Sequence, residues 1–133
     1  MARFEKFEDM VVWQKARVLT RRVYEISNAP SFARDFGLCD QIRRAVVSIM
    51  SNMAEGFERD GDKEFMQFLA LAKGSCGEVR SQLYIASDLG YVSSGDAKML
   101  CGMAVEISKM ISGLMAYLRK SEITGRKYRQ LET

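Results

Sequence analysis

Apolar residues recur at steps of three and four in four separate stretches of the chain. Steps of this size place side chains on one face of an α-helix. The stretches run from Asp9 to Ser27, from Leu38 to Gly56, from Asp62 to Gly90 and from Ser93 to Leu118. Their apolar positions are Val12, Ala16, Leu19, Val23 and Ile26; Ile42, Val46, Ile49 and Met53; Phe65, Leu69, Ala72, Cys76, Val79, Leu83 and Ala86; and Leu100, Ala104, Ile107, Ile111, Leu114 and Leu118. The pattern predicts four amphipathic helices that share one core.

Helix-breaking and capping residues separate these stretches. Pro30 ends the first helix and opens a linker. Residues 58–62 form the turn before the third helix, Gly90 ends that helix, and Ser93 or Ser94 caps the fourth. Such short connections place successive helices antiparallel.

The predicted fold class is therefore all-α, an antiparallel up-and-down four-helix bundle over residues 1–120. The fourth helix is expected to fray near residues 121–125, so that residues 121–133 form a basic C-terminal tail.

The third predicted helix carries small residues at mid-length, among them Gly74 and Gly77. Glycine inside a helix costs about 1 kcal/mol relative to alanine. We therefore expect a neighbouring backbone to approach closely at this point.

The fourth predicted helix has a second apolar track, formed by Met103, Met110 and Tyr117 at steps of seven. One stripe is enough for a bundle, and large exposed apolar surfaces mark interfaces on soluble chains. These three side chains are the candidates for an oligomer interface. A methionine-rich groove for another ligand is the alternative.

The composition offers little for catalysis, because the chain has no histidine and only three cysteines. Glu55, Glu58 and Glu78 could meet across the bundle, but a carboxylate-bridged metal site of a helix bundle also needs histidine. Ion pairs with arginine are the favoured interpretation of these carboxylates. The sequence predicts no enzyme, no catalytic residue, no metal and no cofactor.

The compartment is predicted from what the sequence lacks. The cysteines form no C-x-x-C pair, and the N-terminal residues have no secretory apolar core. The longest apolar run, Phe68 to Ala72, is too short to span a bilayer. We expect a soluble cytoplasmic protein with no membrane partner.

The net charge of +3 comes from the end of the chain. Residues 119–133 hold five basic and two acidic residues, whereas the rest of the chain is balanced. A basic surface can bind phosphates. The candidate nucleic-acid-binding residues are Lys15, Arg43 and Arg44 in the bundle and Arg126, Lys127 and Arg129 in the tail. Structural ion pairs are the alternative role for the first group.

Three stretches together resemble a known family. They are FEDMVVWQKAR (Phe7 to Arg17), FGLCDQIRRAVVSIMSNMAEGFER (Phe36 to Arg59) and FMQFLALAKGSCGEVRSQL (Phe65 to Leu83), followed by LGY from Leu89 to Tyr91. The chain resembles the four helix bundle proteins of the S23, or 23S rRNA intervening-sequence, family. The resemblance implies a bacterial protein that assembles into a homopentamer, with no established enzymatic activity and with a link to RNA suggested by gene location.

Two functions follow as hypotheses. In the first, a non-enzymatic homopentamer binds RNA or a ribonucleoprotein through its basic surface. In the second, the same assembly is a protein-interaction scaffold with no nucleic-acid role.

Overall fold

A computed structural model describes residues 4–132 of the chain, with side chains for residues 4–121. These residues form five α-helices and one 3-10 helix and contain no strand, so the fold is all-α. The elements are η1 (Phe7–Asp9), α1 (Val11–Ser27), α2 (Pro30–Arg34), α3 (Phe36–Glu58), α4 (Asp62–Asp88) and α5 (Ser94–Glu132). Agreement with the predicted bundle is partial, because the short α2 adds a fifth α-helix.

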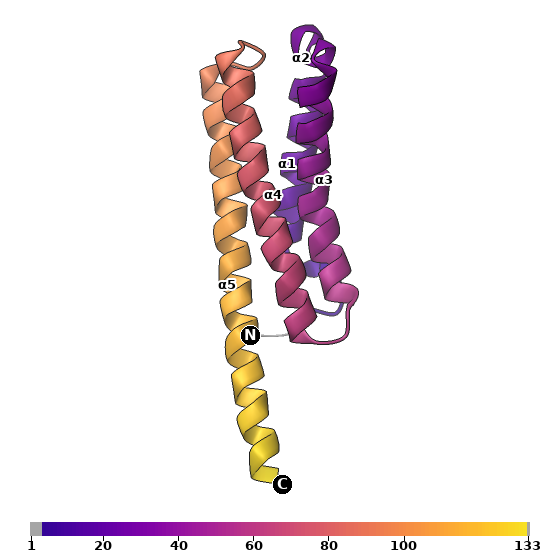
Figure 1. The fold of residues 1–133 in the computed structure, drawn as a ribbon, viewed down its shortest axis with the longest axis vertical. Helices are drawn as coiled ribbons and strands as arrows, with labels where there is room; N and C mark the ends of the chain where they lie inside the picture. Colours follow the sequence, from indigo (N-terminus) through magenta and orange to yellow (C-terminus); the bar gives the residue numbers. More distant parts are fainter. Residues whose placement is uncertain (1–3, 133) are drawn as a thin grey trace.

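The four long helices lie side by side and successive ones run in opposite directions (Figure 1). Helix α1 contacts α3 and α5, and α4 contacts the same two helices. Each long helix therefore has two long neighbours, and the core lies between all four. The predicted stripes form this core: every position is buried except Ile26 and Leu114, which are partly buried.

The connection between α1 and α3 differs from the predicted linker, because Pro30 begins α2 as its first residue. Proline is favoured at that position, where its missing N–H would have no partner. Phe32 of α2 is completely buried and packs against Tyr91, with ring centroids 5.4 Å apart. Burial of this aromatic ring favours the extra helix.

The other helix ends agree more closely with the prediction. The Asp35 side chain accepts a hydrogen bond from the Leu38 amide at 3.1 Å and caps α3, a role the sequence did not reveal. Ser93 Oγ accepts from the Asp96 amide at 3.1 Å and caps α5, as predicted. Gly90 has φ +76°, a backbone conformation that favours glycine at the end of α4. Tyr91 then donates to Asp35 at 3.0 Å and ties this loop to the start of α3.

Helix α5 does not end near residues 121–125. Its backbone stays helical to Glu132, and it extends well past the other helices (Figure 1). The part of α5 from Ser94 to Ser121 is long and apolar enough to cross a membrane, by length and composition only. Of its most apolar 18-residue segment, 22% is buried inside the protein. A core helix of a soluble protein passes the same test.

The close helix contact predicted at the small residues of α4 does not occur at its two glycines, although Ser75 of the same cluster is buried and its Oγ lies 3.0 Å from Ser48 Oγ of α3. A Cβ atom added to Gly74 or Gly77 would meet nothing within 4 Å. The close contact is at Gly56 of α3, where an added Cβ would lie 2.6 Å from Cβ of Phe68. Gly74 and Gly77 are exposed because they lie off the apolar stripe of α4.

Candidate nucleic-acid and self-association surfaces

Arg43 is held firmly between α3 and the end of α1. Its Nε donates to Ser27 Oγ at 2.8 Å and its Nη2 donates to Asn28 Oδ1 at 2.9 Å. Its guanidinium carbon lies 4.7 Å from the centre of the Tyr24 ring. Ser27 is completely buried, so one of these bonds satisfies a hydroxyl that water does not reach. Arg43 is therefore a structural residue that still presents positive charge on this side of the molecule.

Arg17 and Arg21 continue the same side along α1. They precede Tyr24 at steps of four and three, so they lie in line with the residue that Arg43 covers. Both side chains are exposed, and neither forms an ion pair within residues 4–121. Arg17 also lies 6.0 Å from the centre of the Trp13 ring. Sequence reasoning missed both arginines, although their spacing from Tyr24 could have indicated them.

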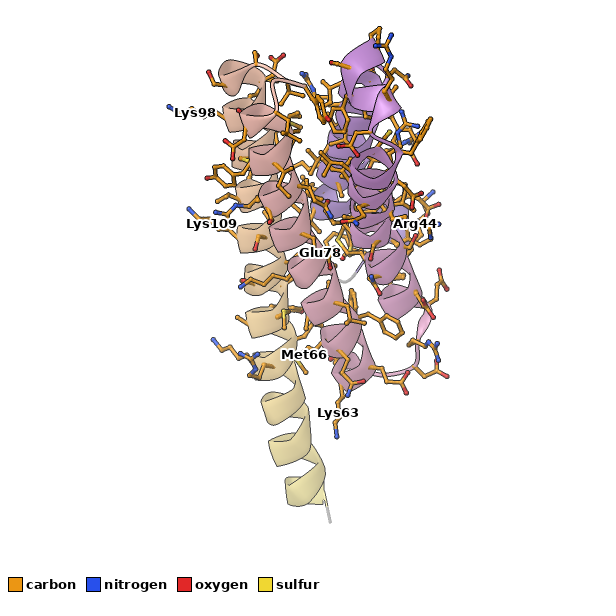
Figure 2. The ribbon with its side chains drawn as sticks, turned by 45° about the horizontal axis from the view of Figure 1, so that its top comes forward. Arg44, Lys63, Met66, Glu78, Lys98 and Lys109 are labelled. Atoms are coloured by element: carbon orange, nitrogen blue, oxygen red, sulfur yellow. The ribbon has the colours of Figure 1, made fainter. Side chains whose placement is uncertain are left out.

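Arg44 projects from α3 beside this row of charges. Its Nε lies 2.8 Å from Asp40 Oδ2, and its side chain is 79% exposed. The hydrogen bond from Arg44 to Asp40 raises the pKa of the guanidinium, which therefore stays charged. We define the α1–α3 basic face as Arg17, Arg21, Arg43 and Arg44. Figure 2 shows Arg44 on the opposite side of the molecule from Lys109 of α5.

Lys15 lies apart from this face. Its Nζ pairs with Glu106 Oε1 of α5 at 2.8 Å, and both side chains are about half exposed. The structure therefore brings Arg43 and Arg44 together and separates Lys15 from them. The side chains of Arg126, Lys127 and Arg129 lie outside the described residues.

Two of the three residues of the second apolar track of α5, Met110 and Tyr117, face the beginning of the chain, whereas Met103 lies outside this contact. Met103, Met110 and Tyr117 are partly buried against the core. Met110 and Tyr117, with Gly113 and Leu114, form one wall of a groove of about 280 Å³. The opposite wall consists of Phe4, Met10, Val11 and Val12. Val11 is 52% exposed, so apolar surface continues from the groove on to α1.

The carboxylates and thiols of residues 4–121 are candidates for chemistry in the sequence. Glu55 pairs with Arg59 one turn away at 3.0 Å, which agrees with the ion-pair interpretation. Within the described residues, no three Cys, Asp or Glu side chains gather where they could hold a metal ion. Burial raises the pKa of the Cys76 thiol to about 11 and also raises the pKa of Cys101. Both thiols are therefore protonated near neutral pH and are poor nucleophiles.

The chain is similar to known proteins in both sequence and fold. The sequence model of the family described as 23S rRNA-intervening sequence protein matches residues 8–113. Among solved structures, the chain is similar to a protein of unknown function from the S23 ribosomal protein family of Bacteroides thetaiotaomicron VPI-5482. That pair has a TM-score of 0.73 and 20% identity, over 79% of this chain and 98% of the other, so the likeness concerns the fold alone. No curated protein matches this chain significantly.

Proposed function

The chain belongs to the 23S rRNA-intervening sequence protein family, and from this membership we propose a non-enzymatic cytoplasmic protein that self-associates and binds RNA, or a ribonucleoprotein. Its unit is the antiparallel up-and-down four-helix bundle of α1, α3, α4 and α5. RNA binds through the α1–α3 basic face, and copies of the chain meet at the groove beside α5.

The exposure of Arg17 and Arg21 carries the RNA proposal. Neither arginine has a carboxylate partner within residues 4–121, so both can bind phosphate without first breaking an ion pair. One helical turn separates them, which is about 6 Å along the axis. Arg43 extends the positive charge across to α3, and its fixed position lowers the entropy cost of binding.

The test is fluorescence anisotropy with a structured RNA at several salt concentrations. Wild-type affinity should fall as salt rises, because bound phosphates release counterions. The double variant Arg17→Gln, Arg21→Gln should bind more weakly and lower the log–log salt slope by about two. Arg22→Gln is the matched control, because Arg22 lines a hollow with Glu25 and Asp96 on the α5 side. Binding that does not depend on salt would refute the proposal.

The self-association proposal is a homopentamer, the assembly that the family resemblance implies. The observation that supports it is the apolar groove between α5 and the start of the chain, flanked by the exposed Val11. Met110→Glu should reduce the mass in solution toward 15.1 kDa, the mass of one chain. Lys109→Glu is the control, because this neighbouring side chain is exposed and lies outside the groove. A wild-type protein of 15.1 kDa in solution would overturn this part of the proposal.

One observation favours the alternative of a protein-interaction scaffold with no nucleic-acid role. Lys15, Arg43 and Arg44 all bond to groups of the protein itself, as a structural role requires. Co-purification from RNase-treated cells separates the two functions, because protein partners that remain without RNA favour the scaffold.

A further inference from the structure

A shallow pocket opens at the start of α3, next to the α1–α3 basic face. Phe36, Gly37, Cys39, Asp40 and Arg43 line it. Phe36 is 82% exposed, more than any other large apolar side chain within the described residues. Full exposure of an aromatic ring is unfavourable in water, so its position beside two charged side chains requires an explanation.

Two walls of the pocket offer hydrogen-bonding groups of opposite kind. Arg43 uses Nε and Nη2 for Ser27 and Asn28, whereas its Nη1 makes no hydrogen bond within the described residues. Asp40 accepts from Arg44 through Oδ2, whereas its Oδ1 has no such bond within residues 4–121. The pocket therefore presents a donor on Arg43, which is held in place, an acceptor on the exposed Asp40 and an exposed aromatic ring. The positive charge of Arg44 partly neutralises the negative charge of Asp40.

We propose that this pocket binds an unpaired guanine base of an RNA strand. The base stacks on Phe36, a contact that RNA-binding proteins commonly use for single-stranded bases. Asp40 accepts from the guanine N1–H and N2–H groups, while Arg43 donates to O6 or N7. This inference rests on the proposed RNA function and names the base that the site selects.

The charges explain why guanine fits best. Guanine has two adjacent donors on its Watson–Crick edge, whereas adenine and cytosine place a ring-nitrogen acceptor next to their single amino group. Such an acceptor would face the Asp40 carboxylate unfavourably. A phosphodiester alone fits less well, because it has no hydrogen-bond donor for Oδ1 of Asp40. The phosphates of the strand can instead reach Arg17 and Arg21 on the adjoining face.

The test compares two fluorescein-labelled uracil-tract RNAs, one with a single central guanine and one with adenine at that place. Wild-type protein should bind the guanine strand about tenfold more tightly. This ratio lies within the discrimination that one good contact to a base edge provides. Asp40→Asn should bring that ratio close to one, and Phe36→Ala should weaken binding of both strands about tenfold. Glu55→Gln is the matched control, because it breaks an equivalent exposed pair with Arg59 on the same helix. It should leave the ratio unchanged.

The outcomes separate the two proposals. If neither strand binds while a structured RNA does, the guanine pocket is refuted and RNA binding stands; if the structured RNA does not bind either, the proposed function fails. If both bind with equal affinity and normal salt dependence, RNA binding stands and the guanine pocket is refuted. Guanosine monophosphate should displace the guanine strand only at millimolar concentration. Displacement at micromolar concentration would overturn the assignment to an RNA strand. Loss of guanine preference in Glu55→Gln would also overturn the pocket.

Discussion

Gly56 gives the sharpest test of the packing between α3 and α4. Replacing it with alanine adds a Cβ that would lie 2.6 Å from Phe68 Cβ and 3.1 Å from Phe65 Cδ1. Carbon atoms in contact prefer about 3.5–4.0 Å. A Cβ atom cannot move away by side-chain rotation. Helices α3 and α4 must therefore separate by most of the difference between this contact and the preferred carbon–carbon distance.

The expected size follows from two opposing contributions. Overpacking a core costs about 1–3 kcal/mol, and a contact this short between two Cβ atoms is near the upper end. Alanine gains about 1 kcal/mol over glycine from helix propensity. Gly56→Ala should therefore destabilise the protein by about 2 kcal/mol, as the difference between these values.

Gly74→Ala is the matched control, because this glycine is also inside a helix and its added Cβ would meet nothing within 4 Å. Only the propensity gain remains there, so the variant should be more stable by about 0.5–1 kcal/mol. Urea unfolding followed by circular dichroism measures both changes at one protein concentration. If Gly56→Ala is as stable as Gly74→Ala, the two helices do not pack as closely as the structure describes.

The remaining predictions concern single interactions. Arg43→Met should lower the free energy of unfolding by about 1–3 kcal/mol, because Ser27 Oγ and Asn28 Oδ1 each lose a hydrogen bond from a charged group, although Ser27 Oγ still donates to the Tyr24 carbonyl; an unchanged urea midpoint would contradict this. Burial raises the pKa of Cys76 from 9.0 to about 11, so its contribution to stability is complete below pH 9 and is lost as the pH rises through 11. Cys76→Ala should lose less stability than wild type between those pH values, and equal losses would argue against the shift. A double-mutant cycle of Lys15→Met and Glu106→Gln should give a coupling below about 1 kcal/mol, because both groups are half exposed; a larger value would indicate a more rigid pair.

Much of the fold was predictable because the apolar stripes are local patterns. The stripe of α3 continues from Met53 by a step of three to Gly56, so the sequence did contain the signal for the close contact. The prediction of a close contact at Gly74 and Gly77 rested on the cluster of small residues around them. The apolar stripe of α4 already placed both glycines outside the core. Position on the helix face decides what a glycine does, and a cluster of small residues does not.

Helix α2 was less accessible to sequence reasoning. Proline both ends helices and begins them, and the five residues of α2 are too few to show a period. Phe32 stabilises this helix by packing against Tyr91, which is distant in the sequence. Only the tertiary structure shows such a contact.

The basic candidates could be proposed from the sequence but not assigned to one surface. Helix α1 packs against both α3 and α5, so residues of one helix belong to two sides of the molecule. Lys15 pairs with α5, whereas the row of Arg17, Arg21 and Tyr24 leads to Arg43. Helix neighbours, which are set by tertiary packing, determined which charges act together.

The contact between α1 and α5 also bears on how the protein is made. A growing chain leaves the ribosome from its N-terminus, so Val11–Ser27 emerges long before Ser94 and the residues that follow it. The half of α1 that faces α5 therefore has no native cover during most of translation. Exposed apolar surface of this kind is what chaperones bind and what leads to aggregation. Synthesis of α5 is consequently the step at which the nascent chain can first close its core.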